Sequence, residues 1–125
     1  MAIFGIHHVQ LSMPRGEEAD AEEFYAGLLG IPRAAKPSHL EVRRGCWFEL
    51  GEVRIHLGVD ADFSPAHRAH PALLVEDLDA LRARLDGAGV DVVDDQPLPG
   101  FERFYVSDPF GNRLELLSPH APAAS

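Results

Sequence analysis

The segment SDPFGNRLEL, residues 107–116, does more than any other stretch of this sequence to define the fold. Residues 108–112 are typical of a tight turn, because proline presets one backbone dihedral angle and glycine readily adopts a positive φ. After the turn, Leu114 and Leu116 alternate with Glu115, which predicts a strand with one apolar and one polar face. Residues 101–107 alternate in the same way, so the segment predicts two strands joined by this turn.

The second half of the chain opens with a further predicted strand at about residues 70–75, which leads into a helix. Asp77 is a suitable N-cap for this helix, because its side chain can accept a hydrogen bond from a free backbone N–H. Glycines then end the helix. The apolar stripe of the helix comprises Leu78, Leu81 and Leu85, and the remaining strands are predicted at residues 90–93, 101–107 and 113–117.

The first half has the same order of elements. Its opening strand is predicted at residues 6–13, where Val9, Leu11 and Met13 alternate with polar residues. A helix at residues 17–29 follows, and acidic residues in its first turns suit the helix dipole. Residues 37–44 are expected to form a loop. The other strands are predicted at residues 31–35, 46–50 and 53–59.

The two halves can be aligned by the spacing of corresponding residues. The helix-ending glycines and the candidate residues on the last strands are 59 positions apart, and two histidines near the opening strands are 62 apart. The small difference fits a change in loop length between strand and helix. The corresponding pairs are Gly30 with Gly89, His56 with Glu115, and His8 with His70.

The repeat predicts an α+β fold of two βαβββ modules that form a curved mixed sheet around a metal and substrate cavity. A chain of 125 residues is sufficient for one domain. We expect a single domain over residues 1–120, with module one at 5–60, module two at 68–118, and a flexible tail at 119–125.

The composition excludes several classes of partner. The net charge of −9, from 11 basic and 20 acidic residues, disfavours binding to nucleic acid or to an anionic membrane. No apolar run is long enough to span a bilayer, and the N-terminus lacks the pattern of a secretion signal. Cys46 is the single cysteine, which excludes an internal disulfide and fits a reducing compartment, so we expect a cytoplasmic protein.

Four repeat-related residues are candidate metal ligands: His8, His56, His70 and Glu115. Their neighbours on the strands are apolar and are expected to face the helices, so the four candidates should face the enclosed space. Imidazole and carboxylate groups bind divalent ions such as zinc, iron, nickel, cobalt or manganese. A histidine on a strand is more often an ordinary polar residue than a ligand, and His56 in particular is open to a role beside the metal or in the cavity wall.

Three further residues are candidates for binding an anionic or phenolic substrate. Arg54 precedes His56 by two positions and therefore shares its face of the strand. Arg103 and Tyr105 alternate with apolar residues on the strand at 101–107. The alternative is that the arginines are solvated and the tyrosine is only half-buried. One of Trp47 and Phe48 should also face the cavity, because the two are adjacent on a strand.

The chain resembles the vicinal oxygen chelate superfamily over residues 6–118. This group includes glyoxalase I, fosfomycin-resistance enzymes, bleomycin-binding proteins and extradiol dioxygenases. The resemblance lies in HVQL at residues 8–11, EFYAGLLG at 23–30 and, most specifically, SDPFGNRLEL at 107–116. It implies metal ligands at His8, His70 and Glu115, with a fourth often at the position of His56.

One departure from the glyoxalase I pattern affects the expected activity. Glyoxalase I has glutamate or glutamine at the position of His56, so Glu115 is the one carboxylate here that is placed to act as a base. This disfavours lactoylglutathione lyase activity. The set His8, His70 and Glu115 also resembles a two-histidine, one-carboxylate triad, which leaves iron-dependent ring cleavage open.

The resemblance implies a divalent-metal-dependent lyase, isomerase or ring-cleaving dioxygenase that acts on a small oxygen-bearing substrate, with Glu115 as the catalytic residue. The alternative is a non-catalytic protein that binds a small molecule or antibiotic, as bleomycin-resistance proteins do. A fosfomycin-type transferase would need a basic cavity, for which the sequence shows few suitably placed arginines. By the same resemblance we expect a homodimer.

Overall fold

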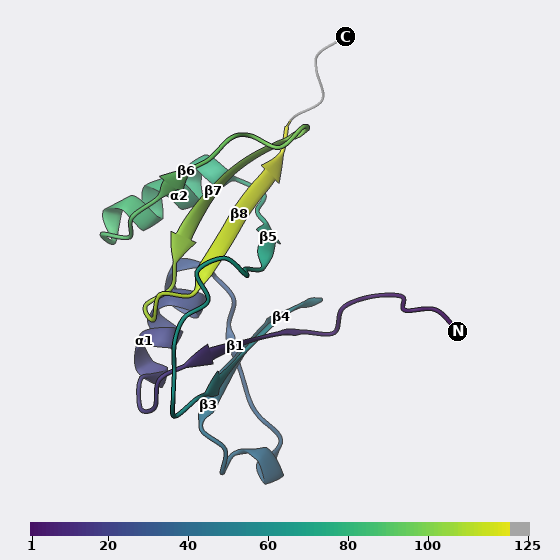
Figure 1. Cartoon of the computed structure of the whole chain (residues 1–125), viewed down its shortest axis with the longest axis vertical. Coiled ribbons are helices and arrows are strands. Elements are labelled where there is room, and N and C mark those ends of the chain that lie inside the picture. Colours follow the sequence, from purple (N-terminus) through teal and green to yellow (C-terminus); the bar gives the residue numbers. More distant parts are fainter. Residues whose placement is uncertain (121–125) are drawn as a thin grey trace. The chain divides into compact units, whose positions relative to one another are not determined.

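The computed structural model describes residues 1–120, so residues 121–125 of the predicted tail lie outside the described part of the chain. The chain divides into two compact units, Met1–Pro65 and a second that begins at Ala66. Each unit contains one βαβββ module, which confirms the predicted α+β class and the internal repeat (Figure 1).

The first unit is built on a four-stranded sheet in the order β1-β4-β3-β2. β1 runs parallel to β4, whereas β3 is antiparallel to both β4 and β2. The connection from β1 passes through a helix, because parallel neighbours cannot be joined by a tight turn. The elements are β1 (Val9–Met13), α1 (Glu18–Glu22), η1 (Glu23–Leu28), β2 (Arg33–Ala34), η2 (Ser38–Leu40), β3 (Gly45–Leu50) and β4 (Val53–Val59).

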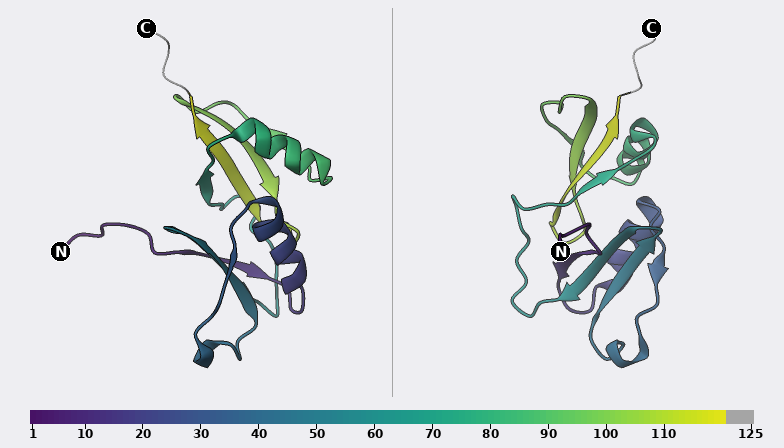
Figure 2. Two further views of the ribbon diagram at one scale, coloured as in Figure 1. Left: turned by 180° about the vertical axis from the view of Figure 1, so that it is seen from behind. Right: turned by 90° about the vertical axis from the view of Figure 1, so that its right-hand side faces the viewer.

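The second unit repeats this topology in the order β5-β8-β7-β6. β5 is parallel to β8, and the remaining pairs are antiparallel. The helix α2 lies along one face of this sheet, as both views in Figure 2 show. The elements are β5 (Ala72–Leu74), α2 (Leu78–Gly87), β6 (Val93–Asp94), β7 (Phe101–Ser107) and β8 (Arg113–Pro119).

The opening strand of each module is shorter than the alternation predicts. β1 begins at Val9 rather than at residue 6, and β5 begins at Ala72 rather than at residue 70. His8 and His70 therefore lie just before these strands. By contrast, β4 and β7 have the predicted bounds, and each is paired with a strand on both sides.

The core of the first unit lies between the sheet and the helical segment. Phe48 and Ile55 are paired in register and are both buried, and Tyr25 stacks on Phe48 with 5.3 Å between ring centroids. The segment is not a uniform α-helix, because the Leu29 N–H bonds to the Phe24 carbonyl, in a π-helical pattern. The wide turn lets the adjacent residues Phe24 and Tyr25 both reach the core.

The core of the second unit consists of the apolar face of β7 and β8 covered by α2. Phe104, Leu114 and Leu116 are almost fully buried on this face, and Leu85 of α2 is completely buried. Burial of side chains of this size stabilises a fold by roughly 1.5–3 kcal/mol each. Leu81, the middle residue of the predicted helical stripe, is only half-buried.

The turn predicted at residues 108–112 is held by a buried carboxylate. Asp108 Oδ1 accepts hydrogen bonds from the backbone N–H groups of Phe110 and Asn112, at 2.9 and 2.8 Å. The Asn112 side chain donates to Asp108 Oδ2 at 2.9 Å. Gly111 has a φ of 94°, so a residue with a side chain would be strained there.

None of the helices among residues 1–120 is long and apolar enough to cross a membrane.

Replacing the N-cap of α2 should destabilise the protein measurably. Asp77 Oδ1 accepts a hydrogen bond from the Ala80 N–H at 3.0 Å. We expect Asp77→Ala to lower the free energy of unfolding by about 1 kcal/mol, measured by urea denaturation. Asp79→Ala is the control, because Asp79 lies in the same first turn without a cap bond and should cost only a few tenths of a kcal/mol. Equal losses in the two variants would contradict the capping role.

The buried thiol of Cys46 should make stability depend on alkaline pH. Cys46 is 1% exposed, and burial raises its pKa from 9.0 to about 11. Below pH 9 both the folded and the unfolded thiol hold their proton; above it, the unfolded thiol ionises first. We therefore expect the wild-type protein to lose about 1.4 kcal/mol of stability per pH unit between about pH 9 and 11, relative to Cys46→Ala. Parallel pH profiles of unfolding free energy would contradict this prediction.

Candidate functional site

The strand register places the candidate residues of the two modules at corresponding positions. In the first unit, His56 of β4 lies between Gln10 of β1 and Trp47 of β3. In the second unit, Glu115 of β8 lies between Ala72 of β5 and Tyr105 of β7. His8 and His70 each precede the paired residue of the opening strand by two positions. The register thus gives the same pairing as the sequence spacing.

A stack of three aromatic rings covers the polar face of the first sheet. The His56 ring lies between His8 and Trp47, with centroid separations of 4.3 and 4.1 Å and interplanar angles of 20° and 5°. His56 is 4% exposed. Trp47 therefore faces the polar side, while Phe48 enters the core, which resolves the choice left open by the sequence.

Glu49 fixes the orientation of the His56 ring. Glu49 Oε2 lies 2.7 Å from His56 Nε2, so this nitrogen donates its proton to the carboxylate. Burial lowers the pKa of His56, the hydrogen bond that His56 donates to Glu49 opposes that shift, and the nearby His8 adds to it. The imidazole is therefore neutral near pH 7, and Nδ1 is the ring atom with an available lone pair.

His8 is the exposed end of this cluster. Its Nδ1 lies 2.9 Å from Nδ1 of His7, so one ring donates to the other. Arg54 Nη1 donates to the His7 backbone carbonyl at 3.2 Å. Arg54 shares the face of His56, as its position in the strand predicts, and lies opposite Glu49 in the register.

In the second unit, His70 and Glu115 form a close pair whose hydrogen bonding is incomplete without a cation. His70 Nδ1 donates to the Arg68 carbonyl at 2.7 Å. His70 Nε2 lies 2.9 Å from Glu115 Oε1, and the Glu115 side chain is only 6% exposed. A neutral imidazole bound through Nδ1–H has a lone pair at Nε2, which would face the carboxylate lone pairs. A proton or a metal ion between the two atoms resolves this conflict.

Arg103 connects Glu115 to Tyr105 on the same face. Its Nη1 donates to the Tyr105 hydroxyl at 2.9 Å and lies 3.6 Å from Glu115 Oε2. The other guanidinium nitrogens bond to the Gln96 carbonyl at 2.8 Å and approach Asp95 Oδ2 at 3.5 Å. The guanidinium is thus engaged by four protein groups and holds both Glu115 and Tyr105 in place.

A comparison with protein families identifies the group to which the chain belongs. The sequence model of the family described as Glyoxalase/Bleomycin resistance protein/Dioxygenase superfamily matches residues 5–116. The chain belongs to this superfamily. Superfamily members commonly bind a divalent metal ion and small-molecule substrates, and they often form dimers.

Solved structures support the assignment. A protein from Bacillus anthracis assigned to the glyoxalase family is 45% identical, with a TM-score of 0.91 over 96% of this chain and 98% of that one. The fosfomycin resistance protein FosX from Listeria monocytogenes is 15% identical, with a TM-score of 0.74 over 95% and 96% of the two chains. The latter likeness shows the fold alone. A search of curated proteins gave no match.

Each unit of this glyoxalase-superfamily protein contributes a pair of candidate ligands rather than a larger cluster. Within residues 1–120, neither unit contains three or more His, Cys, Asp or Glu side chains gathered in a metal-binding arrangement. The first unit offers His8 and His56, and the second offers His70 and Glu115.

Sequence reasoning missed two residues of these clusters. Glu49 was not singled out, although it follows Trp47 by two positions on β3 and therefore faces the same side. Arg113 was also missed; its guanidinium lies 3.8 Å from the ring centroid of Tyr105. Strand parity was the available signal for both.

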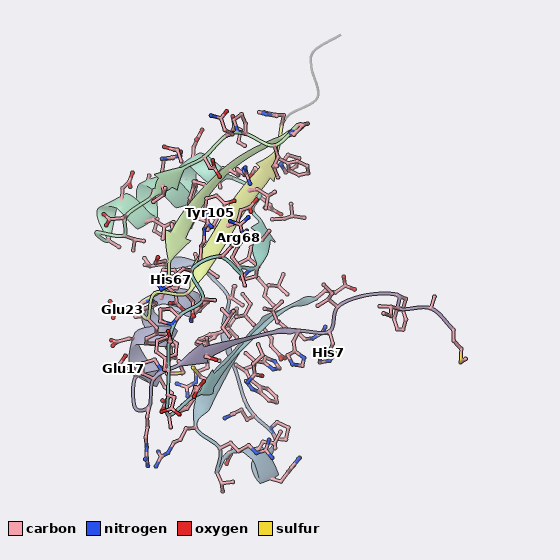
Figure 3. All side chains as sticks on the ribbon, in the orientation of Figure 1. His7, Glu17, Glu23, His67, Arg68 and Tyr105 are labelled. Atoms are coloured by element: carbon pink, nitrogen blue, oxygen red, sulfur yellow. The ribbon has the colours of Figure 1, made fainter. Side chains whose placement is uncertain are left out.

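Figure 3 shows Tyr105 on β7 and Arg68 in the segment that precedes β5.

Neutralising Glu49 should lower the pKa of His56 further. The Glu49 carboxylate favours the protonated imidazole, so Glu49→Gln removes the contribution that opposes burial. We expect the His56 ring signals in chelator-treated protein to titrate at lower pH than in the wild type, measured by NMR. Glu52→Gln in the neighbouring exposed turn is the control and should leave His56 unchanged. An unchanged or raised His56 pKa in Glu49→Gln would contradict the prediction.

Proposed function

We propose that this glyoxalase-superfamily protein is a divalent-metal-dependent enzyme that acts on a small oxygen-bearing substrate, as a lyase, isomerase or ring-cleaving dioxygenase. The observation that carries the proposal is the contact of 2.9 Å between His70 Nε2 and Glu115 Oε1. We further propose that it works as a homodimer in the cytoplasm, in keeping with the dimers common in the superfamily and with the free thiol of Cys46.

The hydrogen bonding of His70 fits a metal ligand. Histidines that bind metals usually donate their second ring N–H to a carbonyl or carboxylate, which fixes the tautomer and aims the other nitrogen at the ion. His70 Nδ1 has such a bond to the Arg68 carbonyl. Nε2 and the adjacent Glu115 oxygen are then two donor atoms of the kinds that zinc, iron, nickel, cobalt and manganese accept.

In this proposal, His8, His70 and Glu115 hold the ion, and His56 is either a fourth ligand or a support for His8. The internal repeat supports the set, because the register gives His8 and His70, and His56 and Glu115, corresponding positions in their modules. The hydrogen bond that His56 Nε2 donates to Glu49 leaves Nδ1 of His56 available for coordination, while the ring stack favours a supporting role.

The bound ion would supply Lewis acidity that stabilises negative charge on substrate oxygens. Glu115 is the proposed catalytic residue and would take a proton from the substrate and return it. Arg103 contacts one Glu115 oxygen and the Tyr105 hydroxyl, so it would keep the carboxylate oriented. Tyr105, Arg103 and Arg54 are the proposed substrate-binding residues.

Elemental analysis of protein purified without added metal tests the proposal. We expect about one divalent ion per site in the wild type and at least a tenfold lower content in His70→Ala, because a ligand is lost. His39→Ala is the matched control, because His39 is an exposed histidine on η2; it should retain wild-type metal.

Equal trace metal in all three proteins, including after incubation with each candidate ion, would contradict the metal site. That result would favour the alternative, a non-catalytic small-molecule or antibiotic-binding protein. Thermal denaturation of the three proteins shows whether a loss of metal reflects a loss of folding.

A further inference from the structure

A basic pocket in the first unit has no role in the proposed function as it stands. It has a volume of about 560 Å³, and Arg15, Lys36, Arg43 and Arg44 lie in its wall. No aspartate or glutamate lines it. The sequence showed few arginines placed for the basic cavity of a fosfomycin-type transferase and did not single out these four cations, which the turn at residue 15 and the loop at 36–44 bring together.

The loop that carries three of these cations is held in a defined shape. Lys36 Nζ donates to the carbonyl oxygens of Arg43 and Arg44 at 2.7 and 3.3 Å, which ties the start of the loop to its end. Between these residues, the Leu40 N–H bonds to the Pro37 carbonyl at 2.8 Å and the Arg43 N–H to the Leu40 carbonyl at 3.0 Å. The backbone of this part of the pocket wall therefore has a defined conformation without a ligand.

The rest of the wall is apolar or aromatic. Trp47, Leu40 and Leu57 line the pocket, and all three are at least half-buried. Gly58 also lines it, and a side chain at this position would collide with the amide of Gln10. The pocket thus combines a cationic rim with an apolar wall, as sites for small organic molecules commonly do.

The charge of the pocket is opposite to that of the chain. The protein has a net charge of −9, yet four of its 11 basic residues gather in this wall. Within residues 1–120, none of these four side chains forms an ion pair with a carboxylate, unlike Arg33, Arg82 and Arg103. Guanidinium groups free of carboxylates can bind carboxylate or phosphate through paired hydrogen bonds. A local cluster of this kind attracts anions that the overall charge repels.

We propose that this pocket binds the anionic end of a small molecule, a carboxylate or phosphate, whose apolar or aromatic body contacts Trp47. Trp47 also stacks on His56, so the pocket adjoins a candidate metal ligand. That the bound molecule is the substrate rests on the proposed function; the binding itself requires no metal.

Trp47 provides a direct measurement, because it is the single tryptophan of the chain. Chelator-treated protein is titrated with benzoate, phenyl phosphate, benzyl alcohol or inorganic phosphate at constant ionic strength, and tryptophan fluorescence is recorded. We expect saturable quenching by benzoate, phenyl phosphate or both, at concentrations at least about tenfold below any response to the neutral alcohol. The two aromatic anions distinguish carboxylate from phosphate recognition, and inorganic phosphate tests the need for an apolar body.

Variants locate the binding. Arg43→Gln and Arg44→Gln should each weaken binding roughly tenfold, because each removes a charged hydrogen-bond donor. Arg84→Gln is the control, since it removes the same charge from an exposed position on α2 in the other unit; it should bind as the wild type does. Circular dichroism confirms folding of each variant.

Three results would overturn the inference: no saturable response to either aromatic anion, an equal response to benzyl alcohol, or equal weakening by Arg84→Gln. If inorganic phosphate binds as tightly as phenyl phosphate, the proposed contact between the apolar body of the ligand and Trp47 is refuted. The His70→Ala variant separates this inference from the proposed function. If His70→Ala lacks the metal that the wild type contains and still binds the anion, both proposals are supported. If the wild type and His70→Ala contain equal trace metal and both bind the anion, only the metal-dependent function is refuted.

Discussion

The parallel pairing of the first and last strands in each module is the constraint on which the other features of this protein depend. It requires a long connection between the two strands, which here contains a helical segment and two further strands, and the helical segment covers one face of the sheet and leaves the other for polar side chains. It also sets Gln10 beside His56 and Ala72 beside Glu115. A shift of one residue would turn His56 and Glu115 toward the helices, so the chemistry of the site depends on this register.

Each sheet has a buried polar residue on the face that the helix does not cover. The different partners of these two residues explain why the modules differ chemically despite a common fold. His56 and Glu115 occupy corresponding positions and are both buried, so each needs a partner to offset the loss of hydration. His56 is covered by aromatic rings, and this burial lowers its pKa, while its hydrogen bond to Glu49 opposes the shift. Glu115 lies beside His70 and Arg103, at 2.9 and 3.6 Å. One fold therefore offers an imidazole nitrogen in one module and a carboxylate oxygen in the other.

The basic pocket shows how a local structure can oppose the overall charge of a protein. The loop between β2 and β3 gathers its cations because Lys36 binds backbone carbonyls near the far end of the loop. The net charge disfavours binding of polyanions but does not determine the field inside a small cavity. Membership of the glyoxalase superfamily leaves the substrate open, and loops of this kind are where members of one fold differ.

The sequence by itself determined the repeat, the α+β class, the polar and apolar strand faces, the turn at Asp108 and the N-cap at Asp77, because these depend on residues close together in the chain. It also singled out the four candidate ligands, because strand parity and repeat spacing are local patterns. Only the tertiary structure decided which partners they have, such as Glu49, and which side chains the loop at 36–44 gathers. Those contacts depend on strand register and loop closure between residues distant in the chain, which no local pattern encodes.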